Sequence, residues 1–131
     1  MRELITAGVD EVGRGCLAGP VVSAAVILKK GINLKLLKDS KKISFYKRDE
    51  ISKHIKNNSY FAIGIASVEE ILNLNILQAS LLSMQRAIEK LEVKPRLTLI
   101  DGNFAPAGLK NCKTIINGDE KIKVISAASI I

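Results

Sequence analysis

The sequence contains few cysteines and histidines. It has two cysteines, Cys16 and Cys112, which are far apart, and one histidine, His54. Because neither a close cysteine pair nor a secretory leader is present, we expect no disulfide framework and no zinc site. His54 lies among Lys53, Ile55 and Lys56 in a predicted helix, which indicates a surface residue without a catalytic role.

Long apolar runs are also absent. No segment approaches the ~20 apolar residues that span a bilayer, and the first residues do not follow the pattern of a signal peptide. We therefore expect a cytoplasmic protein that does not enter a membrane. Neither a P-loop nor a Rossmann glycine motif in its strand–helix context occurs, which leaves a phosphate-binding metabolic enzyme as a remote alternative.

Acidic residues are fewer than basic residues. The 131 residues include 20 lysines and arginines and 13 acids, for a formal net charge of +7. A basic balance favours a polyanionic partner, nucleic acid first and an anionic membrane second. The length and a hydrophobic content of 47% are sufficient for one domain with a core.

The hydrophobic pattern predicts an α/β protein. Strands are predicted at about residues 5–12, 19–28, 59–67, 96–100 and 113–116, and helices at about 44–56, 68–72, 75–91 and from 121 onward. Ser67 and Glu70 form a capping box at the start of the second helix. This order predicts a mixed five-stranded sheet flanked by helices, in which ligands bind beyond the carboxyl ends of the strands.

Four acids lie at the carboxyl ends of predicted strands, and we expect them to converge: Asp10, Glu11, Asp101 and Asp119. Several ionised carboxylates around one point require bound cations, and oxygen ligands favour Mg²⁺ or Mn²⁺ over zinc. Two such ions roughly 4 Å apart can drive phosphodiester hydrolysis. The acids therefore predict metal-assisted hydrolysis, although Asp101-Gly102 and Gly118-Asp119 are also compatible with ordinary turns.

Adjacent acids on a strand raise a geometric difficulty. Side chains of neighbouring strand residues face opposite sides, so Asp10 and Glu11 can share a site only if the strand breaks or twists at Glu11. Gly13 and Gly15 make such a break easier and let backbone approach a ligand closely. Arg14 between them offers a planar set of donors that suits a phosphate group.

Residues 10–22, Asp-Glu-Val-Gly-Arg-Gly-Cys-Leu-Ala-Gly-Pro-Val-Val, resemble the amino-terminal signature of ribonuclease HII, the type 2 ribonuclease H. Further similar motifs follow in the family's order at residues 39–42, 64–67, 75–79, 99–102, 118–121 and 126–130. The resemblance implies a ribonuclease H-like fold. It also implies cleavage of RNA in RNA–DNA hybrids and at single ribonucleotides in duplex DNA, leaving 3′-hydroxyl and 5′-phosphate ends.

The resemblance also implies roles for individual residues. The catalytic, metal-binding acids of the family match Asp10, Glu11, Asp101 and Asp119, which would hold two Mg²⁺ or Mn²⁺ ions in the substrate complex. The loop that recognises the 2′-hydroxyl, the local mark of ribose, matches Gly13, Arg14 and Gly15. A lysine that contacts backbone phosphate matches Lys41. The expected partner is an RNA–DNA hybrid or ribonucleotide-containing duplex DNA, bound by a monomer.

Family members continue beyond the position that matches Ile131, into helices that add duplex contacts. We therefore expect a single ribonuclease H-like catalytic domain over residues 1–131 that lacks the family's C-terminal helical part. The alternative is a truncated, catalytically impaired remnant of the same fold that binds nucleic acid.

Overall fold

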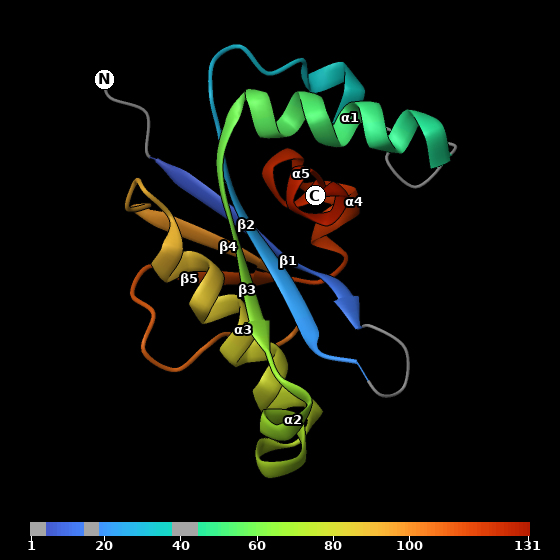
Figure 1. Ribbon diagram of the computed structural model, residues 1–131. Coiled ribbons are helices and arrows are strands. Elements are labelled where there is room, and N and C mark those ends of the chain that lie inside the picture. Colours follow the sequence, from blue (N-terminus) through green and yellow to red (C-terminus); the bar gives the residue numbers. More distant parts are fainter. Residues whose placement is uncertain (1–4, 15–18, 38–44) are drawn as a thin grey trace.

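The protein is built on one mixed sheet (Figure 1), and the computed structural model describes residues 5–14, 19–37 and 45–131. The strand order is β3-β2-β1-β4-β5. The bounds are β1 (Thr6–Arg14), β2 (Val21–Leu28), β3 (Ser59–Ala66), β4 (Leu97–Asp101) and β5 (Cys112–Ile115). β2 pairs antiparallel with β1 and β3, whereas β4 runs parallel to β1 and β5. The predicted mixed five-stranded sheet is confirmed.

Helices cover both faces of this sheet. They are α1 (Phe45–Asn57), α2 (Val68–Leu74), α3 (Ile76–Lys90), α4 (Gly118–Lys121) and α5 (Lys123–Ile130), with a short 3₁₀ helix η1 (Leu34–Leu37) that the sequence did not predict. The helix predicted from residue 121 onward corresponds to α5, and the short helix α4 before it was not predicted; Ile122, with φ −119° and ψ 122°, is extended between the two. Ser44, the predicted cap of the first helix, lies outside the described residues.

The predicted capping box at the start of α2 is confirmed. Ser67 Oγ accepts the Glu70 N–H at 3.1 Å, and Glu70 Oε1 accepts the Ser67 N–H at 3.0 Å. Arg86 of α3 donates to both Glu70 oxygens at 2.6 Å and to the Ile65 carbonyl at 2.7 Å. These hydrogen bonds lower the pKa of Glu70 to about 2 and join the end of β3 to α2 and α3.

Two glycines allow helices to approach the sheet closely. A Cβ at Gly8 of β1 would overlap the backbone of Val124 in α5. A Cβ at Gly64 of β3 would overlap backbone atoms of Ser83 and Ala87 in α3. The two faces form separate cores, one with α1 and α5 and the other with α3.

The side chains of β1 alternate between these two cores. Ala7 and Val9 are buried in the core beneath α3, whereas Gly8 contacts α5. Asp10 therefore belongs to the α5 face and Glu11 to the α3 face. Among the described residues, no helix combines the length and the apolar character needed to cross a membrane.

Candidate metal centre

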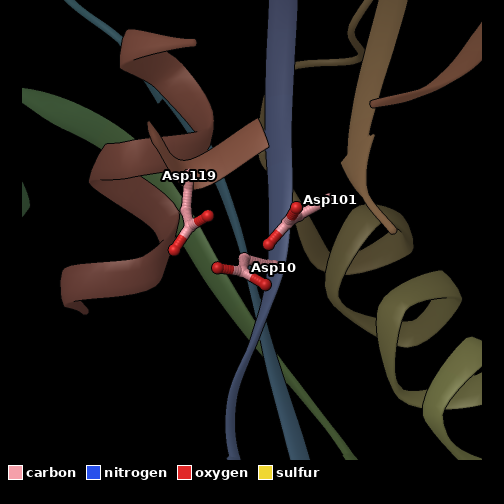
Figure 2. A group of neighbouring side chains, drawn as sticks. All are labelled: Asp10, Asp101 and Asp119. Atoms are coloured by element: carbon pink, nitrogen blue, oxygen red, sulfur yellow. The ribbon is translucent and has the colours of Figure 1, made fainter. Parts of the chain in front are cut away.

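Three of the four predicted acids come together on the α5 face. Asp10, Asp101 and Asp119 each contribute a carboxylate oxygen to a group whose members lie within 4.8 Å of one another. Figure 2 shows the three carboxylates turned toward one another. The pairing of β1 with β4 reaches Val9 and Ile100, so Asp10 and Asp101 are the next residues on adjacent parallel strands.

Asp119 lies on α4 and reaches the group because this helix begins beside Asp101 of β4. The backbone N–H of Gly118, the first residue of α4, donates to Asp101 Oδ1 at 2.7 Å. Asn117 precedes it in the left-handed region, with φ 55°, and this turns the chain back toward β4. The same carboxylate is thus a member of the acid group and a hydrogen-bond acceptor at a helix start.

Burial and like charge make Asp10 a weak acid. The side chain is almost buried, at 9% exposure. Desolvation first, then the charge of Asp101 and a hydrogen bond with it, and then the charge of Asp119 raise the pKa of Asp10 from 3.8 to about 8. In the cation-free protein, burial and the neighbouring carboxylates therefore favour the protonated form of Asp10. A divalent cation would offset the repulsion, and three carboxylates are a donor set that fits Mg²⁺ or Mn²⁺.

We expect the stability of the cation-free protein to fall as the pH rises from about 4 to about 8. In this window folded Asp10 holds a proton that the unfolded chain releases, so the free energy of unfolding falls as the pH rises. Asp10→Asn removes this slope and makes the variant more stable than wild type at about pH 8. Urea unfolding in EDTA across this pH range measures both slopes, and equal slopes in the two proteins would contradict the prediction.

Glu11 does not join the group of three. It pairs with Ser23 of β2 in regular register, and the Ser80 hydroxyl of α3 donates to its Oε2 at 3.2 Å. The irregularity in β1 lies between Glu11 and Gly13, one step beyond the position at which a break was predicted. The role of Glu11 as a metal ligand stays a prediction.

The residues predicted to bind substrate are described only in part. Gly13 and Arg14 form the end of β1, where they pair with Val22 and Val21 of β2. Gly15 and Lys41 lie outside the described residues. Recognition of a 2′-hydroxyl by the Gly13–Gly15 loop and of phosphate by Lys41 therefore stays a prediction.

Two contributors to the site were not identified from the sequence. Gly118 supplies a backbone donor to Asp101, and Ser80 supplies a hydroxyl to Glu11. Ser80 could have been noticed because Ser80 and Ser83 share the helical spacing of the buried residues Met84 and Ala87 on α3. A polar pair on an otherwise apolar helix face indicates a buried polar partner.

The sheet order, the flanking helices and the acid group between β1, β4 and α4 define a protein of the ribonuclease H-like class. The crystal structure of ribonuclease H2 from Pyrococcus horikoshii OT3 superposes with a TM-score of 0.76 and 27% identity, covering 95% of this chain and 68% of that one. Residues 7–131 match the sequence model of the family Ribonuclease HII. The chain belongs to the ribonuclease HII family.

Curated relatives agree with this assignment. The chain is 62% identical over 129 residues to Ribonuclease HII of Pelagibacter ubique (strain HTCC1062), covering 97% of this chain. It is 52% identical over 129 residues to Ribonuclease HII of Coxiella burnetii (strain RSA 493 / Nine Mile phase I), covering 98% of this chain. It spans 69% and 64% of the lengths of these two relatives. The resemblance found in the sequence and the predicted fold are both confirmed.

Proposed function

We propose that this protein is a ribonuclease H. Its substrates are the RNA strand of RNA–DNA hybrids and ribonucleotides embedded in duplex DNA, and its products carry 3′-hydroxyl and 5′-phosphate ends. The observation that carries the proposal is the convergence of Asp10, Asp101 and Asp119 within 4.8 Å in a chain of the ribonuclease HII family. The net charge of +7 supports a polyanionic substrate.

The cofactor in this proposal is Mg²⁺ or Mn²⁺, held by Asp10, Asp101 and Asp119, with Glu11 as the fourth acid. When bound, a pair of such ions activates water and stabilises the leaving oxygen of a phosphodiester. The Gly118 N–H fixes the direction of the Asp101 carboxylate, and the burial of Asp10 strengthens its attraction to any cation beside it.

Substrate recognition in this proposal belongs to the end of β1 and to one lysine. The backbone of Gly13 and Gly15 contacts the 2′-hydroxyl, Arg14 lies beside the phosphate backbone, and Lys41 contacts a phosphate. Since DNA lacks the 2′-hydroxyl, these contacts select the junction at a ribonucleotide. We propose that the protein acts as a monomer in the cytoplasm, without a membrane partner.

The test is cleavage of three duplexes that share one sequence: an RNA–DNA hybrid, a DNA duplex with one ribonucleotide, and an all-DNA duplex. We expect the first two to be cut with Mg²⁺ or Mn²⁺ and to remain intact in EDTA, while the all-DNA duplex stays intact throughout. Cleavage of the all-DNA duplex at a similar rate, or cleavage in EDTA, would contradict the proposal.

A second candidate is a remnant that binds nucleic acid without cutting it. The net charge of +7 supports contacts to phosphates whether or not cleavage follows. In that case the ribonucleotide-containing duplex stays intact with either ion. Its affinity for the protein would still fall steeply with salt, as expected for contacts to phosphates.

A further inference from the structure

Beneath α3, one row of residues crosses three strands. Glu11 of β1 pairs with Ser23 of β2, and Ser23 pairs with Gly64 of β3, so the three residues lie side by side on the same face. Because Gly64 has no side chain, the backbone of α3 approaches the sheet here. This approach brings Ser80 and Ser83 of α3 onto the row.

The three serines are buried, and each makes a hydrogen bond on this row. Ser23 and Ser83 are fully buried, and Ser80 is 6% exposed. Ser83 Oγ donates to the Ser80 carbonyl at 2.7 Å, which uses its one hydroxyl proton. In the 2.6 Å pair of Ser23 and Ser83 hydroxyls, Ser23 must therefore be the donor. These two bonds end on the Ser80 carbonyl and hold this turn of α3 against the sheet, and the Ser80 hydroxyl separately donates to Glu11 Oε2 at 3.2 Å.

Glu11 follows Asp10 directly in β1, at the end of the strand where the pairing with β4 has stopped. The pairing of β1 with β4 extends only to Val9 and Ile100, because β4 ends at Asp101. Beside Glu11 the described part of β4 therefore forms no pair with β1, and this edge of β1 lies next to the acid group. The direction in which the Glu11 carboxylate points decides whether it serves a cation held by Asp10.

We propose that Ser80 is a positioning residue for the metal centre, acting through Glu11. The proposal rests on the proposed function insofar as Glu11 is one of its cation-binding acids. A hydroxyl fixed by burial, on a helix held against Gly64, limits the rotamers of the Glu11 side chain. Outer partners of this kind orient the ligands of a metal, and their loss typically weakens metal affinity about 10- to 100-fold.

The experiment is a double-mutant cycle read by calorimetric titration of Mn²⁺ into the protein without nucleic acid. The proteins are wild type, Ser80→Ala, Glu11→Gln and the double variant. We expect Ser80→Ala to weaken Mn²⁺ binding about 10- to 100-fold and to have no further effect once Glu11 is Gln. Ser80→Thr, which keeps the hydroxyl, should restore affinity. Ser59→Ala is the matched control, since it removes another buried serine hydroxyl, one that donates to Ile55 O.

Three results would overturn the proposal. They are unchanged Mn²⁺ affinity in Ser80→Ala, effects of the Ser80 and Glu11 changes that add in the double variant, and a wild-type protein that does not bind Mn²⁺. If Mn²⁺ binding follows the expected cycle but wild type cuts none of the three duplexes, the ribonuclease proposal fails and the role of Ser80 stands. If wild type cuts as expected and Ser80→Ala binds Mn²⁺ normally, only the role of Ser80 fails.

Discussion

Asp101→Asn is expected to lower ribonucleotide-dependent cleavage at least about a thousandfold, roughly 4 kcal/mol of transition-state stabilisation. Asparagine removes the negative charge from the acid group but keeps an oxygen that can accept the Gly118 N–H. The start of α4, and with it Asp119, should therefore remain in place. Cleavage rates at saturating Mn²⁺ measure the loss of activity, and the circular dichroism spectrum shows whether the fold is retained.

Two further variants test whether the lost cleavage is specific to the charge of the acid group. Asp101→Ala removes both the charge and the acceptor, so it should match Asp101→Asn in lost cleavage but be less stable. Asp49→Asn removes an exposed acid of α1, 3.4 Å from Lys53, and should cut as wild type does. Cleavage by folded Asp101→Asn within tenfold of wild type would show that the acid group does not carry the reaction.

Gly64→Ala is expected to lower the free energy of unfolding by at least about 3 kcal/mol. The added Cβ would overlap backbone atoms of Ser83 and Ala87, which cannot turn away as the end of a side chain can. α3 would have to move off β3 and open the core that contains Met84 and Ile88. Against a typical total of about 5–15 kcal/mol, a loss of this size is large.

The matched control for Gly64→Ala is Gly108→Ala. A Cβ at Gly108 meets no atom within 4 Å, so this change should alter stability by no more than about 0.5 kcal/mol. Urea midpoints of both variants give the comparison. Equal midpoints for the two variants would mean that α3 can shift at Gly64 without loss of stability. The close approach of α3 to β3 would then not contribute to the stability of the fold.

The secondary structure could be predicted because its signals are local. The apolar run of β2 and the Ser67–Glu70 capping box lie within a few residues of the elements they define. The short helix α4 and its separation from α5 could not be predicted in this way. Ile122 has an ordinary apolar side chain, and its extended backbone accompanies the placement of Gly118 against Asp101, 17 residues earlier in the chain.

The candidate site could be predicted in part for a related reason. Asp10 and Asp101 lie close together because each follows an apolar segment, and these two segments pair as parallel strands β1 and β4. The sequence also predicted that Glu11 would converge with these acids, and the structure instead keeps it on the opposite face, as regular strand alternation dictates. The sequence could not reveal where Glu11 finds its partner, because Ser80 is 69 positions away and meets it only through the packing of α3.

The parallel pairing of β1 with β4 also has a kinetic consequence. β1, β2 and β3 form antiparallel pairs, whereas β1 meets β4 only when Thr6 finds Leu97, which closes a much longer loop. We therefore expect Asp10 and Asp101 to meet later in folding than the antiparallel strands pair. A cation that binds the assembled group acts on the finished molecule, so it slows unfolding more than it accelerates folding.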